Sequence, residues 1–140
     1  MTPEQIALVQ QSFAQVLPIR EQAAQIFYER LFALDPSLRP LFKGDLRAQG
    51  AKLMSALTFV VGALHKLDTI LEEVRMLARR HVGYGVQENH YALVGSALLG
   101  TLEEAFGPDF TPAQSAAWGA AYQALAGAMM AAARDMQQAA

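Results

Sequence analysis

The chain has 140 residues, of which 53% are hydrophobic and 17% charged, so it can form one domain with a sizeable buried core. Its formal net charge of -2 gives no reason to expect a nucleic-acid partner, because binding to a polyanion needs concentrated positive charge. The absence of cysteine excludes disulfides and thiolate metal sites, which leaves histidine and carboxylates as the usual metal ligands.

The first part of the chain is predicted to be helical, with prolines at the joints between segments of helical apolar periodicity. A capping-box pattern over residues 2–5 predicts the start of a first helix, which Pro18 ends. A second helix is predicted over residues 20–34, because Pro36 disfavours helical geometry in the residue before it. A short helical turn is predicted over residues 37–41.

A longer helix is predicted from about residue 46, with apolar side chains as far as Leu64 along one stripe. The next helix is predicted to end at His81, directly before a glycine-rich break, and Asp68 is placed to cap its start. These two helices contain most of the candidate functional residues.

The last part of the chain is predicted to form two further helices, over residues 87–106 and from Thr111 toward Met136. Gly107 follows the first of them, and Gln114 completes a capping box at the start of the second. No segment shows the two-residue alternation of a half-buried strand, so the chain is predicted to be all-α, with seven to eight helices.

The N-terminus lacks a positive region followed by an apolar run, and no stretch approaches the roughly 20 apolar residues of a membrane span. We therefore expect a cytoplasmic protein that has no membrane span.

Six groups of residues follow one another in an order and at spacings that are informative together. They are Ile26–Tyr28, Asp35–Pro36 with Leu41–Phe42, Gln49–Met54, Ala78–Val86, His90–Gly95 and Ala117–Tyr122. In this order the chain resembles the globin family, specifically bacterial single-domain globins and the haem domain of flavohaemoglobins. The resemblance covers nearly the whole chain and implies a single globin domain over residues 1–140 that encloses a haem pocket. Helical periodicity alone is equally compatible with a plain bundle.

His81 is the residue on which the functional interpretation depends. The resemblance implies that it is the proximal ligand of the haem iron, the metal-binding residue of the site. A histidine at the frayed end of a helix can turn one nitrogen into a cavity while a carbonyl one turn back fixes the other. The alternative is a histidine at a helix C-terminus, where its charged form interacts favourably with the helix dipole.

Tyr28, Gln49 and Leu53 are the candidate residues on the other, distal side of the iron. Gln49 and Leu53 are four residues apart and therefore lie on one helix face. The resemblance implies that Gln49 and Tyr28 donate hydrogen bonds to bound dioxygen, with Leu53 beside them. Alternatively, Gln49 is an exposed helix residue, and Tyr28 is a core tyrosine bonded to a backbone carbonyl.

The resemblance also implies further contacts to the cofactor from Phe42, Lys52, Leu53 and Val86. Phe42 matches the phenylalanine that packs flat against the porphyrin, and Lys52 could pair with a propionate at the rim. The helix-end charges Arg79 and Arg80 could do the same, since guanidinium pairs well with carboxylates. Without the resemblance, Phe42 is a core aromatic and these cations are solvated.

Tyr91 matches the tyrosine that, in flavohaemoglobins, approaches the proximal histidine and joins it to a glutamate on the last helix. That glutamate position holds Ala133 in this chain. The missing carboxylate weakens the case for peroxidase-like or nitric oxide dioxygenase chemistry, because an acceptor near the imidazole raises electron donation to iron. His65 and His90 are not expected to bind iron, and His90 is expected to be a cap or surface residue.

The sequence thus predicts a globin that binds haem b (iron protoporphyrin IX) and reversibly binds dioxygen, with high affinity from Tyr28 and Gln49. Carbon monoxide and nitric oxide are further expected ligands. The alternative is a nitric oxide dioxygenase that uses a separate reductase as electron donor. A third possibility is a haem-free helical interaction module, for which the apolar composition would be sufficient.

Overall fold

The structure is a computed structural model that describes the backbone of residues 1–42 and 44–139 and the side chains of residues 1–42 and 44–136. This part of the chain forms α-helices and short 3-10 segments and contains no strand, so the all-α prediction is confirmed. The α-helices are α1 (Pro3–Val16), α2 (Arg20–Leu34), α3 (Leu46–Gly62), α4 (Leu71–Gly83), α5 (Glu88–Phe106) and α6 (Pro112–Ala139).

Four 3-10 segments connect these helices: η1 (Leu17–Ile19), η2 (Pro36–Leu41), η3 (Leu64–Ile70) and η4 (Gly107–Asp109). The described residues therefore hold six α-helices, slightly fewer than the seven to eight predicted. The difference arises because the predicted turn over residues 37–41 adopts the tighter 3-10 geometry, with Pro40 inside it.

The predicted capping boxes are present at the start of α1 and at the start of α6. The Thr2 hydroxyl accepts from the Gln5 backbone N–H at 3.1 Å, and the Gln5 side chain accepts from the Thr2 N–H at 3.0 Å. Thr111 and Gln114 repeat the arrangement at the start of α6. His90 also caps a helix, because its Nδ1 accepts from the Gln87 N–H at 3.0 Å.

The prediction that Asp68 caps α4 was wrong. The chain leaves α3 at Gly62, turns through η3 with a kink at Lys66, and starts α4 at Leu71 without a side-chain cap. Leu64 is therefore buried from η3 and does not extend the α3 stripe. The following helix also runs two residues past its predicted end, to Gly83.

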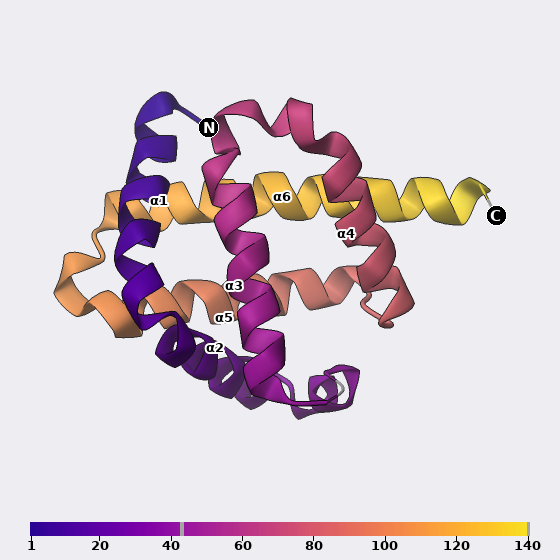
Figure 1. Ribbon diagram of the computed structural model, residues 1–140, viewed down its shortest axis with the longest axis horizontal. Coiled ribbons are helices and arrows are strands. Elements are labelled where there is room, and N and C mark those ends of the chain that lie inside the picture. The colour runs from indigo at the N-terminus through magenta and orange to yellow at the C-terminus, as the bar shows by residue number, and fades with distance from the viewer. Residues whose placement is uncertain (43, 140) are drawn as a thin grey trace.

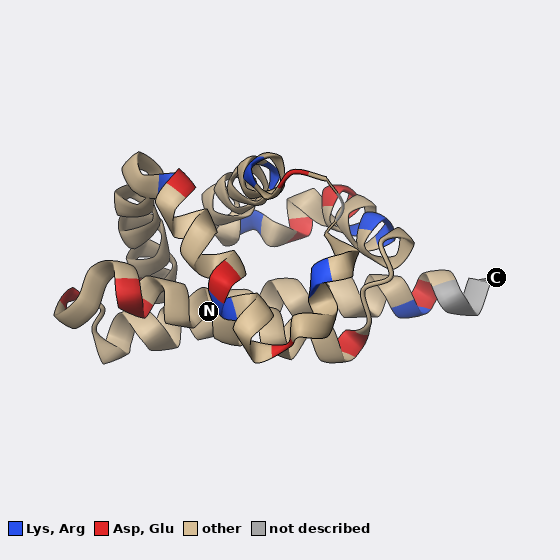
Figure 2. Cartoon of the chain, turned by 90° about the horizontal axis from the view of Figure 1, so that it is seen from below, with Lys and Arg blue, Asp and Glu red and all other residues tan. Residues whose placement is uncertain are grey.

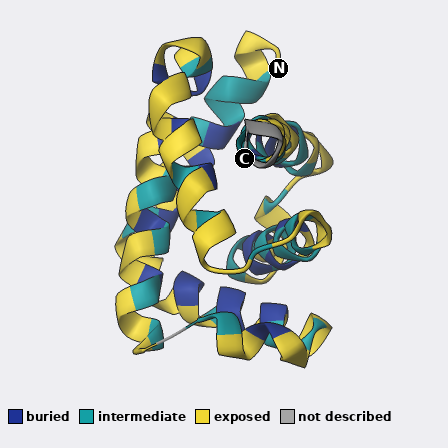
Figure 3. Cartoon of the chain, turned by 90° about the vertical axis from the view of Figure 1, so that its right-hand side faces the viewer, coloured by how far each residue is buried: buried dark blue, intermediate teal, exposed yellow. Residues whose placement is uncertain are grey.

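Two long helices, α5 and α6, lie side by side with opposite chain directions, and α3 crosses in front of them (Figure 1). α1 and α4 both pack on α6, whereas α2 packs on α5 and α3. Each helix turns its buried face inward and its exposed face outward, which is the pattern of helices around a shared core (Figure 3).

At the centre of the core, the first helix, α1, packs against the last helix, α6. Phe13 of α1 and Trp118 of α6 lie with ring centroids 6.1 Å apart. The Trp118 indole N–H donates to the buried Ser12 hydroxyl at 2.8 Å, and that hydroxyl donates to the Leu8 carbonyl. Each polar atom of this group is therefore satisfied inside the core.

Acidic and basic residues are spread over several helices (Figure 2). Among the described residues, no single helix is long and apolar enough to cross a membrane. Only α3 taken together with the segment Leu64–Gly83 reaches the required length and composition, and that pair is bent by 101°.

Candidate functional site

Tyr28 lies at the centre of an aromatic cluster formed by α2 and the residue that ends η2. Its ring is edge-on to Phe27 and Phe42, at centroid distances of 5.2 and 5.3 Å, and lies nearly parallel to Phe32 at 6.0 Å. We call these four side chains the Tyr28 cluster. Leu53, together with Leu93 and Val94 of α5, packs against it.

A close crossing of α2 and α3 brings the predicted distal residues toward this cluster. A Cβ atom built on Gly50 would lie 2.9 Å from the Ala24 Cβ and 3.8 Å from the Tyr28 ring, so the two helix backbones approach closely here. Gln49 directly precedes this glycine and is half-buried, and Leu53 lies one turn further along α3.

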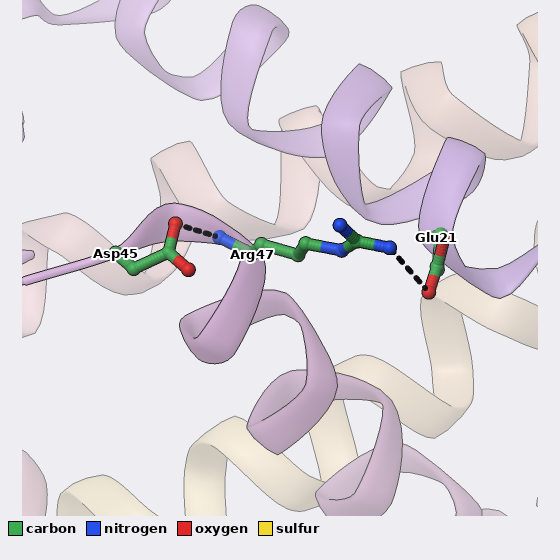
Figure 4. Close-up of polar contacts among 3 residues, drawn as sticks. All are labelled: Glu21, Asp45 and Arg47. Atoms are coloured by element: carbon green, nitrogen blue, oxygen red, sulfur yellow. Dashed lines mark hydrogen bonds and ion pairs between the residues drawn. The ribbon is translucent and has the colours of Figure 1, made fainter.

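Polar contacts on the surface fix the start of α3. Asp45 caps the helix by accepting from the Arg47 N–H at 3.0 Å, and the Arg47 guanidinium pairs with Glu21 of α2 at 3.5 Å (Figure 4). Both side chains of the ion pair are about three-quarters exposed, so the pair itself contributes little stability. The crossing therefore depends on the small residues beneath it.

The Tyr28 hydroxyl is the polar atom of this apolar region. The residue is 5% exposed, and burial raises the pKa of its phenol to about 12, so the group is neutral and can donate a hydrogen bond at physiological pH.

His81 lies in the last turn of α4 and is half-buried. Its Nδ1 lies 2.7 Å from the Leu77 carbonyl oxygen, one helical turn back, as the helix-end geometry predicted. Because a carbonyl can only accept, Nδ1 carries the hydrogen, and the Nε2 of the neutral ring keeps its lone pair. This tautomer is the one needed for Nε2 to bind a metal.

The chain turns sharply after His81. The Val86 N–H donates to the His81 carbonyl at 3.0 Å, and Gly85 provides the left-handed φ of 86° that the turn requires. A Cβ on Gly85 would lie 3.5 Å from a methyl of Leu41, the residue before Phe42. This turn therefore links the His81 end of α4 with the segment that carries Phe42.

Tyr91 of α5 lies beside His81, with ring centroids 6.4 Å apart and planes inclined by 22°. Burial, and secondarily the charge of Glu88, raise the pKa of its phenol. The Glu88 carboxylate is paired with Arg134, whose guanidinium makes two contacts to it, at 2.5 and 3.0 Å. The structure therefore places the Glu88 carboxylate on α5, one turn before Tyr91. The position on α6 at which the resemblance implies a glutamate holds Ala133.

Tyr122 is a residue near the site whose role was not predicted from the sequence. Its hydroxyl donates to the Tyr91 carbonyl at 2.5 Å, and burial raises the pKa of its phenol. It lies against Gly95, where a Cβ would come within 2.8 Å of the Tyr122 ring. This glycine, one turn after Tyr91, was the only signal in the sequence that a large side chain packs here.

The remaining candidates divide into half-buried and exposed residues. Phe42 and Val86 are half-buried. Lys52, Arg79 and Arg80 are exposed, so they can serve only at the rim of a site.

The structure also shows how the two sides are connected. Leu93 and Val94 pack against the Tyr28 cluster, while Tyr91 belongs to the apolar group that packs α4 on α6. One turn of α5 therefore contributes to both the Tyr28 side and the His81 side.

Comparison with known proteins identifies the family. Residues 25–129 match the model of the globin family. Flavohemoproteins of Bordetella pertussis and Bordetella bronchiseptica are each 32% identical to this chain over 129 residues, which are 90% of the chain. The chain spans about a third, 32%, of the length of these relatives.

Solved structures show the same arrangement of helices. A bacterial globin from Campylobacter jejuni superposes with a TM-score of 0.87 at 25% identity, covering 98% of this chain and 99% of that one. An engineered carbene transferase from Rhodothermus marinus, whose parent is assigned as a nitric oxide dioxygenase, gives 0.89 at 26% identity, covering 99% and 97%. The predicted globin fold is thereby confirmed, and the chain belongs to the globin family.

Proposed function

We propose that this globin holds haem b through Nε2 of His81 and reversibly binds dioxygen, and also carbon monoxide and nitric oxide. The observation that carries the proposal is the hydrogen bond from Nδ1 of His81 to the Leu77 carbonyl, which places the hydrogen on Nδ1 and, in the neutral ring, the lone pair on Nε2. The 32% identity to flavohemoproteins supports it.

The residues present fit such a cofactor. A porphyrin supplies four nitrogen ligands itself, so the protein would need to provide one imidazole, and His81 would hold the iron through Nε2. The Tyr28 cluster, Leu53 and Val86 provide apolar side chains of the kind that bury a macrocycle. When bound, the haem iron supplies the open coordination position at which a diatomic gas binds.

The distal residues would determine how long dioxygen stays bound. The Tyr28 phenol is a neutral donor, and Gln49 has a side-chain amide, which is a donor group as well. Each hydrogen bond to a polar ligand contributes about 0.5 to 1.5 kcal/mol, and more if the ligand carries charge. Two donors would therefore slow release of dioxygen by roughly one to three orders of magnitude.

The rim residues would orient the cofactor. The exposed cations Lys52, Arg79 and Arg80 would pair with the haem propionates, and Phe42 would pack against the porphyrin face. Tyr91, held through its carbonyl by Tyr122, would keep the His81 ring in place.

Stopped-flow measurement of dioxygen dissociation from the haem-loaded protein tests the distal assignment. Tyr28→Phe keeps the ring and removes the hydroxyl, so the dissociation rate should rise by about tenfold. Gln49→Leu should also raise the rate. Tyr84→Phe is the matched control, because it removes the hydroxyl of a 58% exposed side chain and keeps the ring that lies 6.4 Å from His81, so its rate should equal that of the wild type. Equal rates for Tyr28→Phe and Tyr84→Phe would contradict the donor role of Tyr28.

A second candidate function is nitric oxide dioxygenation, which the Rhodothermus marinus neighbour favours. It needs a separate reductase as electron donor. The substitution of Ala133 for a glutamate and the engagement of Glu88 by Arg134 count against strong electron donation from His81. Repeated nitrate formation with a surrogate flavin reductase would support this function, and a single stoichiometric reaction would contradict it.

A further inference from the structure

The side chain of Arg39 holds Phe42, the residue that follows η2. The Phe42 backbone N–H donates to the Arg39 carbonyl at 3.1 Å, and Nη1 of Arg39 donates to the Phe42 carbonyl at 2.8 Å. Arg39 therefore binds both backbone polar groups of Phe42. These two hydrogen bonds close the turn from which the Phe42 ring reaches Tyr28.

The backbone of η2 has few hydrogen bonds of its own, so side chains have to fix its ends. The segment is a 3-10 helix of six residues, and Pro36 and Pro40 have no N–H to donate. Asp35 fixes the start by accepting from the Ser37 N–H at 3.0 Å. The Arg39 guanidinium fixes the other end.

The same guanidinium also contacts the Tyr28 cluster directly. Its central carbon lies 5.7 Å from the centroid of the Phe32 ring, within the range of a cation–π interaction. The Phe32 ring in turn lies edge-on to Phe42 at 5.5 Å and nearly parallel to Tyr28 at 6.0 Å. Arg39 is exposed, so it packs on the cluster from the solvent side. It thus holds two of the three rings that surround Tyr28.

We infer that Arg39 is a positioning residue of the proposed distal site, which fixes Phe42 and Phe32 and thereby the direction of the Tyr28 hydroxyl. This role rests on the proposed function. A planar guanidinium can donate from its edge while its face lies on an aromatic ring, and a lysine ammonium lacks that geometry. Without Arg39 the two rings gain freedom, the Tyr28 phenol points at the bound ligand for a smaller fraction of the time, and the ligand leaves faster.

Dioxygen dissociation from the haem-loaded protein tests this role in a double-mutant cycle with Tyr28. Arg39→Met should raise the rate by about threefold in the wild-type background, because part of the Tyr28 hydrogen bond is lost, and should leave the rate of Tyr28→Phe unchanged. Arg39→Lys keeps the charge without the planar fork and should restore only part of the wild-type behaviour. Arg75→Met is the matched control, since it removes an exposed arginine that pairs with Glu72 within α4, and its rate should equal that of the wild type.

An equal rise in both backgrounds would mean that Arg39 acts independently of Tyr28, and no rise in the wild-type background would mean that it does not act on the site. Either result overturns the inference. Exchange of the Phe42 amide hydrogen, followed by NMR in the protein as purified, tests the contact itself. Arg39→Met should speed this exchange by about fivefold, and unchanged exchange would overturn the contact. Failure of the proposed function gives a different result, since a protein that takes up no haem has no dissociation rate but shows the same change in amide exchange.

Discussion

At the scale of single residues, the proposed chemistry rests on two side chains, His81 and Tyr28. The Leu77 carbonyl fixes the hydrogen of His81 on Nδ1, so that in the neutral ring the lone pair is on Nε2. The Tyr28 hydroxyl lies in an apolar cluster, and burial keeps it protonated. One residue thus offers a lone pair and the other a proton.

Burial of Tyr28 predicts a specific loss of stability at alkaline pH. Its pKa is about 12 in the folded protein and close to 10 when unfolded, so below pH 10 the group is neutral in both states. As pH rises from 10 to 12, the unfolded state ionises first and folding weakens. At pH 11, midway between the two pKa values, the loss from this residue is on the order of 1 kcal/mol.

Urea unfolding at pH 8 and pH 11 measures this loss. Tyr28→Phe should lose on the order of 1 kcal/mol less than the wild type between the two pH values, because all other titrating groups are shared. Tyr84→Phe, with an exposed phenol, should lose as much as the wild type. An identical pH dependence in all three proteins would refute the burial effect.

At the scale of helices, the crossing of α2 and α3 positions the residues proposed for the distal side. Gly50→Ala places a methyl 2.9 Å from the Ala24 Cβ, closer than real side chains approach. Overpacking of this kind costs about 1 to 3 kcal/mol, so we expect a lower free energy of unfolding and faster dissociation of dioxygen. The displaced α3 would carry Gln49 and Leu53 away from Tyr28.

Gly62→Ala is the control for this prediction. Gly62 ends the same helix and has no atom within 4 Å of an added Cβ, so the substitution should leave the free energy of unfolding unchanged or raise it. Chemical denaturation of both variants makes the comparison. Equal stabilities would mean that the two helices do not approach as closely as the structure shows.

The helix ends also show what could be predicted from sequence. The capping boxes at Thr2 and Thr111 were predicted correctly, because a cap is formed by residues three apart in the chain. Asp68 has the residue type of a cap, yet η3 replaces the expected start of α4. Packing of buried residues such as Leu64 and Ile70 competes with local capping there, and a local pattern does not report it.

At the scale of the whole molecule, the site is assembled from segments far apart in the chain. The resemblance to globins predicted the candidate residues, and the structure places Tyr91 beside His81 and Leu53 against the Tyr28 cluster. The bond from Tyr122 to Tyr91 could not be predicted in this way. It depends on how α5 and α6 pack, which no local spacing specifies.

The central claim is that His81 is the axial ligand of a bound haem. The most direct measurement is the absorption and resonance Raman spectrum of the ferrous protein, for the wild type and for His81→Gly. We predict an iron–histidine stretching band in the wild type, its loss in His81→Gly, and its return when imidazole is added to fill the space left by the side chain. A His81→Gly protein that keeps the wild-type spectrum and haem affinity without imidazole would contradict the account.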